Sequence, residues 1–518
     1  MKGFKALIMR SLHNSFKSDK MIFFAENFFS DSTTFPGKEL ISQKFFFLKN
    51  FYSFCSNQLR KGLILIFLTG CAVGPHYQTP EVALPTSYYE PHDKKEIDLS
   101  ELKEWWTAFH DPLLNALIHE ALSQNLDLKI AIEKIHQVRA EYQIETAELY
   151  PKIDLTAEQK RTRISQNLFD SSFLGPPMQN FYKVGFDASW EIDIFGKQRR
   201  AKEGAYYTYE AEVESARDIY ITLLSEIAAT YIQVRGFQQK IALSKRDIYI
   251  QKELLELAEV RFVAGLDSEL SPQEIEVNLE ESQALLPTLE TSYRQSLHRL
   301  AVLLGKTPES LHGDFSEQQA IPINTSPIPV GLPSDLLRRR PDIRKAERLL
   351  AAATANVGEA IADLFPRFSL LGSFGFESNK THNWFKAKSH SWSLGPNIDW
   401  PIIYFGRIRS NIRAQNAKQE QALLNYEQTI LTSLEDVENS LVAYYKEEER
   451  THRYEKQVKA SRRTYELTRD KYLSGLVSFS ILLDADSALV FAENNLVDSQ
   501  QSLSTHLVAL YKSLGGDW

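Results

Sequence analysis

The sequence is poor in the residues on which metal sites and covalently stabilised domains depend. It has only two cysteines among 518 residues, Cys55 and Cys71. One disulfide is therefore the upper limit. If Cys71 is lipidated and Cys55 is removed with the leader, no thiol pair is left for a disulfide or a cysteine-based metal site. The histidines are scattered, and no two lie at metal-ligand spacing on a helix beside a carboxylate. The sequence predicts neither a bound metal nor any other cofactor.

Motifs of catalytic sites are also missing. The segment ending in Gly305-Lys-Thr307 lacks the leading glycine of a phosphate-binding loop. The segment Gly372-Ser-Phe-Gly375 lies in a predicted strand, not at the strand-to-helix turn of a nucleophile elbow. We therefore do not expect an enzyme.

Positive charge and long apolar runs are scarce as well. The net charge is −8, and because residues 1–70 hold ten Lys/Arg and four acids, the remaining residues carry −14. An acidic chain of this kind argues against binding to nucleic acid. No continuous apolar run reaches the roughly 18 residues of a membrane-spanning helix. Any membrane crossing would then require a β-barrel.

A switch from one sequence period to another is the strongest positive signal. Apolar residues alternate with polar or small ones at Tyr182, Val184, Phe186, Ala188, Trp190, Ile192 and Ile194. This alternation predicts a strand with one apolar face. Beyond it the apolar period becomes seven, at Val213, Tyr220, Ile227, Val234, Ile241, Ile248, Leu255 and Phe262. We expect the strand to lead into a long coiled helix, with Gly196 as the bend.

The same switch occurs again 210 residues later. Phe195-Gly-Lys197 matches Phe405-Gly-Arg407, so Gly406 is the second expected bend. Two further pairs, Arg261–Gly265 with Lys471–Gly475 and Leu304-Gly305 with Leu514-Gly515, share this offset. The heptad continues at Leu423, Ile430, Val437 and Tyr444. Long helices can look alike by composition alone, but paired junctions at one offset favour an internal duplication.

The duplication predicts a mainly helical body with two similar halves. The first, residues 112–305, comprises a helix from Asp111-Pro112 to about Tyr150, a β-hairpin over 152–194 and a helical hairpin over 197–304. A Pro-rich linker follows at 306–333. The second half, 334–518, repeats the plan with a helix to Leu364, a β-hairpin over 367–404 and a helical hairpin over 407–514. The long helices 197–263 and 407–473 would each extend for roughly 100 Å.

The N-terminal region has the layout of an export signal. Residues 59–70 begin with basic residues, continue with a short apolar core and lead to Leu68-Thr-Gly-Cys71. The last four residues resemble the bacterial lipobox, in which the cysteine is lipidated and becomes the new N-terminus. The alternative is a buried apolar stretch with an incidental cysteine. On the lipobox interpretation, residues 71–111 form an extended lipidated arm, and residues 1–58 reflect a misassigned translation start.

Four amphipathic strands per chain are too few for a closed barrel, because the smallest known transmembrane barrels use eight. Unpaired strand edges are not tolerated in lipid. Strands that cross a membrane here must therefore come from several copies, which predicts an obligate oligomer. Aromatic residues near the strand ends fit an interfacial girdle: Phe181, Tyr182, Trp190, Trp392 and Trp400. The edge of a soluble β-sandwich is the alternative.

Over residues 60–518 the chain resembles the outer-membrane factors, the TolC-like efflux channels, and specifically their lipoprotein branch. The most specific segments are Cys71-Ala-Val-Gly-Pro-His-Tyr77, Gly331–Asp342, Leu364-Phe-Pro366 and Leu482–Leu489. The resemblance implies a homotrimer with a shared outer-membrane β-barrel and an α-helical periplasmic tunnel. It also implies a periplasmic adaptor and an inner-membrane pump as partners, contact with outer-membrane lipid, and no catalytic residues.

The resemblance further implies roles for residues at the helical turns. The turns that follow the long helices match tip loops that contact the adaptor, through Gly265, Leu266, Ser268, Gly475, Leu476 and Ser478. Two plain tight turns are the alternative. Asp484 matches a constriction aspartate, which in a trimer would form a ring of carboxylates that favours cations. Ile481 stands where the family has a second acid. A solvated helix acid is the alternative for Asp484.

The function implied by the resemblance is a passive outer-membrane exit duct for drugs or other toxic solutes in a tripartite efflux pump. One rival is the outer-membrane duct of a type I secretion system, with a polypeptide cargo. The other is a non-conducting lipoprotein whose coiled coils span the periplasm as a spacer. Conductance separates the spacer from both ducts.

Overall fold

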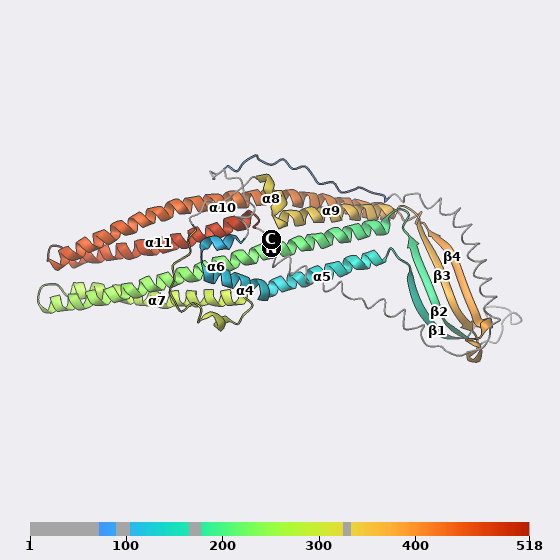
Figure 1. The fold of residues 1–518 in the computed structure, drawn as a ribbon, viewed down its shortest axis with the longest axis horizontal. Coiled ribbons are helices and arrows are strands. Elements are labelled where there is room, and N and C mark those ends of the chain that lie inside the picture. The colour runs from blue at the N-terminus through green and yellow to red at the C-terminus, as the bar shows by residue number, and fades with distance from the viewer. Residues whose placement is uncertain (1–71, 90–103, 164, 166–177, 325–332, 517–518) are drawn as a thin grey trace.

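The computed structural model describes residues 72–89, 104–163, 165, 178–324 and 333–516. These residues form an elongated molecule with a four-stranded sheet at one end and two long helical hairpins extending away from it (Figure 1). Cys71, the signal segment 59–70 and the preceding residues 1–58 lie outside the described residues, as do parts of the arm and the linker.

The two helical hairpins are alike in length and layout. Helices α6 (Lys197–Val263) and α10 (Arg407–Leu473) each have 67 residues. The chain returns through α7 (Leu270–Leu303) and α11 (Phe479–Ser513), and α11 also packs against α6. Among the helices of the described residues, none is both long and apolar enough to cross a membrane.

The predicted heptad of α6 is buried only in the middle of the helix. Tyr220, Ile227 and Val234 are at most 4% exposed, whereas Phe262 is 42% exposed. Towards the end of the helix the buried positions shift to Gln251, Leu254 and Ala258. A straight α-helix drifts about 20° per heptad, so one stripe cannot face the same neighbours along 67 residues. In α10, Ile430, Val437 and Tyr444 are buried as predicted.

The single helix predicted between residue 112 and about residue 150 is wrong, because the structure has two. Asp111 caps α4 (Pro112–Gln124) as predicted, accepting hydrogen bonds from the Leu113 and Leu114 amides at 2.9 and 3.2 Å. Helix α5 (Leu126–Ala147) starts anew after Asn125. The Asn125 side chain accepts from the Leu128 amide at 2.9 Å and donates to the Leu303 carbonyl at 2.8 Å. This local cap replaces helix continuation at Asn125.

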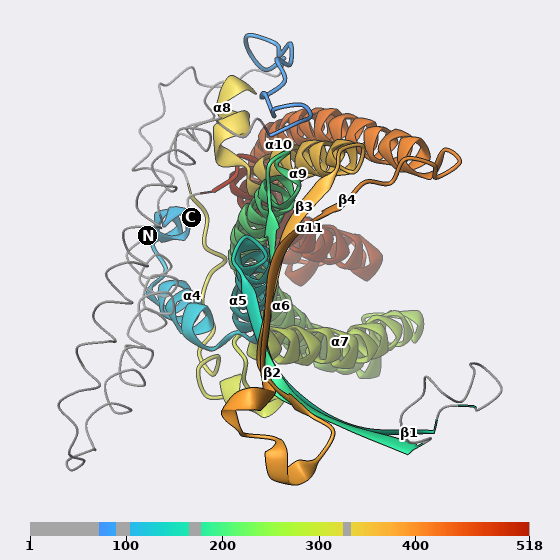
Figure 2. The same ribbon diagram turned by 90° about the vertical axis from the view of Figure 1, so that its right-hand side faces the viewer.

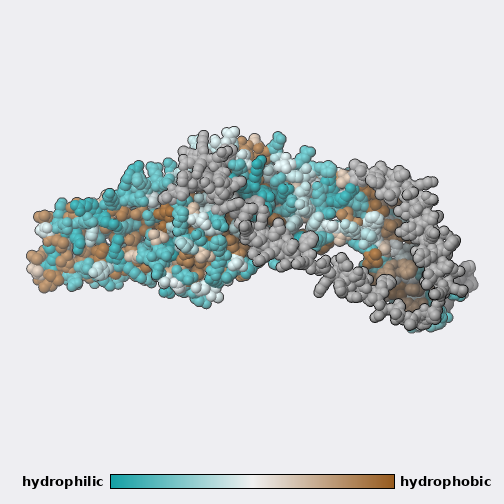
Figure 3. Space-filling view, viewed as in Figure 1, coloured by the Kyte–Doolittle hydropathy of each residue, from teal (hydrophilic) through white to brown (hydrophobic). Residues whose placement is uncertain are grey.

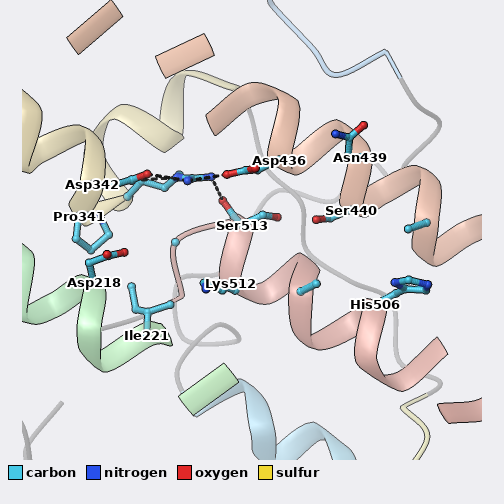
Figure 4. Close-up of a pocket in the computed structure, with 14 residues that line it drawn as sticks. Asp218, Ile221, Pro341, Asp342, Asp436, Asn439, Ser440, His506, Lys512 and Ser513 are labelled. Carbon is cyan, nitrogen blue, oxygen red and sulfur yellow. Dashed lines mark hydrogen bonds and ion pairs between the residues drawn. The ribbon is translucent and has the colours of Figure 1, made fainter. Parts of the chain in front are cut away.

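The single helix predicted from Ser334 to Leu364 is also divided. Helix α8 (Pro333–Arg339) ends at Arg340, which has φ −70° and ψ 118°, and α9 (Pro341–Ala362) follows. The ring of Pro341 disfavours a helical conformation for the residue before it. The Arg340 guanidinium donates hydrogen bonds to Asp342 at 2.7 Å, to Asp436 at 3.0 Å and to the Ser513 carbonyl at 3.2 Å (Figure 4). Arg340 thereby joins α9, α10 and α11 beside a surface pocket.

The sheet combines strands from both halves. Its strands are β1 (Lys152–Arg163), β2 (Met178–Ile192), β3 (Arg367–Ser378) and β4 (His390–Asp399), all antiparallel in the order β1-β2-β3-β4. The sheet is curved (Figure 2). Strand β4 ends five residues before the predicted end at residue 404, at Asp399, which pairs with the first residue of β3, Arg367. Within the described chain, β1 and β4 each keep one unpaired edge.

A hydrophobic core holds the middle of the molecule together. The ring of Trp105, in the short 3₁₀ helix η1 (Trp105–Phe109), stacks on Tyr511 of α11 at 5.2 Å. Leu114, Ile227 and Val437, from three different helices, are fully buried in the same cluster. This core fixes the two halves to each other and leaves the sheet and the helical ends projecting from it.

Candidate functional site

The two turns at the far ends of the helical hairpins have the same backbone geometry. Gly265 and Gly475 have φ of 71° and 76°. The Leu266 amide donates to the Arg261 carbonyl, and the Leu476 amide to the Lys471 carbonyl, both at 2.9 Å. In each turn the glycine amide also donates to the carbonyl three residues before it. The two bonds together form a Schellman motif in each turn. The positive φ explains why glycine stands at both positions.

Apolar side chains are exposed at both tips. Leu266 is 69% and Leu476 is 74% exposed, and the neighbouring Ser268 and Ser478 are exposed as well. The surface view shows apolar residues at this end of the molecule, beyond largely hydrophilic helical sides (Figure 3). The two hairpin ends therefore offer apolar surface to a partner protein.

The two tips are not equivalent in their side chains. Asp267 of the first tip accepts hydrogen bonds from its neighbours, the Ser268 amide at 2.9 Å and the Ser271 hydroxyl at 2.8 Å. The second tip has Val477 at the matching position, which cannot make these bonds. Asp267 also accepts from the Tyr472 hydroxyl at 3.4 Å. The first tip is therefore capped by its own aspartate and bonded to the end of α10.

A small apolar cluster lies directly behind the tips. It comprises Leu254, Ala258 and Ile275 from the first hairpin with Tyr472, Phe479 and Leu482 from the second, all buried. The Arg261 guanidinium lies 4.7 Å from the centre of the Tyr472 ring. The ends of the two hairpins are thus held together by packing, a cation–π contact and one hydrogen bond.

The predicted constriction residue, Asp484, lies on the exposed side of α11, close to the tip. Ile481, one turn earlier, is 48% exposed. Within the part of the chain that the structure describes, no side chain bonds to Asp484. An exposed carboxylate on this surface is free to face a shared pore, which remains a prediction for the oligomer.

A second carboxylate, Asp486, was missed by the sequence reasoning. It is 1% exposed, and its carboxylate accepts a hydrogen bond from Gln251 of α6 at 2.9 Å. Burial, together with the nearby Asp247 carboxylate, raises the pKa of Asp486 to about 7, although Arg246 opposes the shift. The sequence does indicate the burial of Asp486, because Leu482, Asp486 and Leu489 are spaced by four and then three residues, as on a buried helix face.

Glu493 extends this polar contact between the hairpins. It is 6% exposed and accepts a hydrogen bond from Arg462 of α10 at 2.7 Å. Its other oxygen forms an ion pair with Arg246 of α6. The interface between α6 and α11 therefore contains a row of buried acids, of which Glu493 is neutralised by arginines and Asp486 is bonded to an amide.

Both predicted bends have the geometry that glycine permits. Gly196 has φ 80° and Gly406 has φ 88°. Beside them, the indole nitrogen of Trp190 donates to the Leu149 carbonyl at 3.0 Å, and that of Trp400 to the Leu364 carbonyl at 3.1 Å. The strand-to-helix junction is therefore constructed in the same way in both halves.

The N-terminal arm begins at the first junction. The Val73 amide donates to the Phe195 carbonyl at 3.1 Å. Arg200, whose side chain is 2% exposed, donates to the carbonyls of Val73 at 3.2 Å and Gly74 at 3.3 Å. A Cβ at Gly196 would lie 2.6 Å from the Ala72 Cα, so the arm and the bend are in close contact.

The described residues contain no group of three or more His, Cys, Asp or Glu side chains that could hold a metal ion. What the arrangement offers is a set of surfaces: two exposed tips, an exposed acid near them, and a sheet with open edges.

Comparison with known proteins gives consistent matches along almost the whole described chain. The family model described as "Outer membrane efflux protein" matches residues 117–306 and 332–516. The solvent efflux pump outer membrane protein SrpC of Pseudomonas putida is 32% identical over 463 residues, covering 88% of this chain and 97% of the relative. Nodulation protein T of Rhizobium leguminosarum bv. trifolii is 30% identical over 453 residues, covering 88% of this chain and 96% of the relative.

Similarity to a solved structure extends to the fold. The outer-membrane channel OprN matches with a TM-score of 0.80 and 33% sequence identity, covering 86% of this chain and 100% of that chain.

Proposed function

Because the chain belongs to the outer membrane efflux protein family, we propose that three copies assemble into the exit duct of a tripartite efflux pump in the outer membrane. The observation that carries this proposal is that the described residues form a sheet of four strands whose outer edges, at β1 and β4, are unpaired. Four strands are too few to close a barrel, and unpaired backbone groups are costly in lipid. If β4 of one copy pairs with β1 of the next, the backbone groups at both edges of each sheet are hydrogen-bonded.

The two faces of the sheet fit a wall between lipid and water. Along β2, Val184, Phe186 and Trp190 project from one face, while Asp187 and Glu191 project from the other. Phe186 and Trp190 are 52% and 37% exposed in the single chain, although they are apolar. Lipid contact in the assembly would remove this apolar area from water.

The helical hairpins supply the periplasmic part of the duct. A helix of 67 residues is roughly 100 Å long, a length suited to bridging a wide periplasmic gap. The exposed tips, with Leu266 and Leu476, would dock a periplasmic adaptor that connects the duct to an inner-membrane pump. The solvent efflux pump relative favours small solutes over a polypeptide cargo.

A lipid anchor at Cys71 would reinforce the membrane attachment. Cys71 lies outside the described residues, but its neighbour Ala72 contacts the bend at Gly196, where the sheet meets the helices. An acyl chain on the preceding residue would then enter the membrane beside the barrel.

The test is reconstitution of the full chain into planar bilayers, with size measurement in mild detergent. The expected results are a trimer and single-channel conductance, and co-purification with an adaptor and a proton-driven pump. A chain that stays monomeric in mild detergent, or that dissolves without detergent, would refute the shared barrel. A membrane-inserted trimer without conductance would instead support the spacer function.

A further inference from the structure

The two faces of the sheet differ in charge as well as in polarity. The register of the four strands places a set of apolar residues on one face: Ile153, Leu155, Ala157, Val184, Phe186, Ala188, Trp190, Ile192, Phe368, Leu370, Phe374, Phe376, Trp392, Leu394 and Ile398. The acids of the strands all alternate to the other face: Asp154, Glu158, Asp187, Glu191, Glu377 and Asp399. Within the four strands, the apolar face therefore carries no negative charge.

At the end of the sheet remote from the helices, the apolar face becomes basic. The apolar side chains of β1 on this face end at Ala157, and the next residues on the same face are Gln159, Arg161 and Arg163. Both arginines are exposed. Their partners across the ladder are Asn180 and Met178, so no acid lies opposite them.

The loop between β3 and β4 adds three lysines at the same end. The ring of Trp384 lies 5.4 Å from that of Tyr182, and the ring of Phe385 lies 5.8 Å from that of Phe376. Tyr182 and Phe376 alternate to the apolar face of their strands. The loop is therefore folded against this face. Its residues Lys380, Lys386 and Lys388 are exposed, and Lys386 and Lys388 line a surface pocket at the end of the sheet together with Phe181 and Glu377.

We call Arg161, Arg163, Lys380, Lys386 and Lys388 the basic rim. Within the described chain, none of their side chains forms an ion pair or hydrogen bond with a protein side chain. The contrast with the rest of the molecule is large, since residues 71–518 carry a net charge of −14. In a closed barrel β4 of one copy would lie beside β1 of the next, which would bring the lysines and the arginines of neighbouring copies together.

We propose that the basic rim binds the phosphate groups of phosphorylated glycolipid in the outer leaflet around the barrel. The inference rests on the proposed function, because the rim meets lipid headgroups only if the apolar face lies in a bilayer. Lys and Arg side chains reach from the edge of an apolar band towards charged headgroups. Guanidinium groups bind phosphate through two parallel hydrogen bonds. Tyr182 and Trp384, between the band and the rim, are the aromatic types enriched at the membrane interface.

The experiment measures lipid binding to the full-length trimer in neutral detergent. The probes are bis-phosphorylated lipid A and the same lipid A after enzymatic dephosphorylation, both quantified on the protein by native mass spectrometry. The test variants are R161Q/R163Q, K386Q/K388Q and the four changes combined. The matched control is K456Q/K459Q, which removes two exposed lysines from α10. We expect the combined variant to bind the phosphorylated lipid at least about tenfold more weakly, and the control to bind it as the wild type does.

Three outcomes would overturn the inference while leaving the duct intact. Equal binding of phosphorylated and dephosphorylated lipid would show that phosphate is not recognised. Equal binding by wild type and the combined variant would show that the rim is only solvated. Full competition by inorganic phosphate at millimolar concentration would show binding of a free anion instead of a lipid. Insertion and conductance in phosphatidylcholine bilayers, recorded for each protein, test the proposed function separately. A wild-type chain that does not insert would refute both proposals, whereas an inserted trimer without conductance would refute only the duct. If R161Q/R163Q fails to assemble, K386Q/K388Q in the loop remains informative.

Discussion

The Tyr472 hydroxyl at the end of α10 donates a hydrogen bond of 3.4 Å to the Asp267 carboxylate in the turn after α6. This bond adds to the apolar cluster and the cation–π contact that hold the ends of the two hairpins together. The hydrogen bond lies near solvent, since Asp267 is only half-buried. Its loss is therefore expected to affect local opening at the tips more than the folding of the helices behind them.

Tyr472→Phe should loosen the tips without disturbing the cluster behind them. The change removes the hydroxyl and keeps the ring beside the Arg261 guanidinium and against the ring of Phe479. Loss of one hydrogen bond of about 1 kcal/mol should speed amide exchange around the tips about fivefold. Hydrogen exchange with mass spectrometry measures this. Tyr249→Phe is the control, because its hydroxyl bonds to Glu253 on the same helix. Equal exchange in both variants would contradict the link.

Gly475→Val should distort the second tip, and Gly475→Asn should not. Nothing lies within 4 Å of a Cβ built on Gly475, so the cost arises from its φ of 76°. A branched residue in this conformation costs about 1–2 kcal/mol, whereas asparagine tolerates it. We expect Gly475→Val to reduce co-purification with the adaptor while the trimer persists.

The control for the tip variant is Gly313→Val, since Gly313 lies in open space and has no positive φ. Normal adaptor binding and drug resistance in Gly475→Val would argue against an adaptor contact at this tip. The same pair of substitutions at Gly265 provides a second test, because its φ is 71°.

The long elements were predictable because their signals are repeated many times. Alternation over β2 and the heptads of α6 and α10 average over many residues, and the helix bounds at Lys197, Val263, Arg407 and Leu473 agree with the structure. The breaks depend on single residues instead. Asn125 ends α4 through one side-chain cap, and Pro341 divides the helix after Ser334 through its ring. Such local effects are easily outweighed in a prediction based on periodicity.

The site was only partly predictable for a related reason. The glycine turns are visible in the sequence because positive φ restricts the residue type. Residue type alone cannot show which acid of α11 is buried, since Asp484 and Asp486 are both aspartates and lie two residues apart. Only the packing of α11 against α6 places Asp486 in the interface and leaves Asp484 exposed.

Cys71→Ala should abolish lipidation and leave assembly intact. The arm is held at the junction by its own contacts, with Arg200 bonded to the Val73 and Gly74 carbonyls. The barrel, not the acyl chain, should keep the protein in the membrane. Incorporation of labelled palmitate measures acylation, and membrane fractionation measures attachment. Continued incorporation of label into Cys71→Ala would contradict the assignment of the anchor.

Asp484→Asn should weaken cation preference in single-channel recordings. A ring of three carboxylates, one from each copy, would attract cations and narrow the pore. Neutralising it should move the reversal potential in a KCl gradient towards zero and raise the conductance. Asp470→Asn is the control, because it removes the same charge from the exposed side of α10 near the tip. Recordings that do not differ between Asp484→Asn and wild type would remove this residue from the constriction.

Asp486 should make the stability of the hairpin interface depend on pH. Burial raises its pKa from 3.8 to about 7, so between about pH 4 and pH 7 the native chain keeps a proton that the unfolded chain has lost. Native stability therefore decreases as pH rises through this window, by at most about 1.4 kcal/mol per pH unit for this group, and the decrease is complete above about pH 7. Asp486→Asn keeps an acceptor for Gln251 and removes the ionisation. We expect its melting temperature to exceed that of the wild type at pH 8 and to match it near pH 4. Asp484→Asn, on the exposed side of the same helix, should follow the wild type at both pH values, and an equal response of the two variants would show that burial of Asp486 is not the cause.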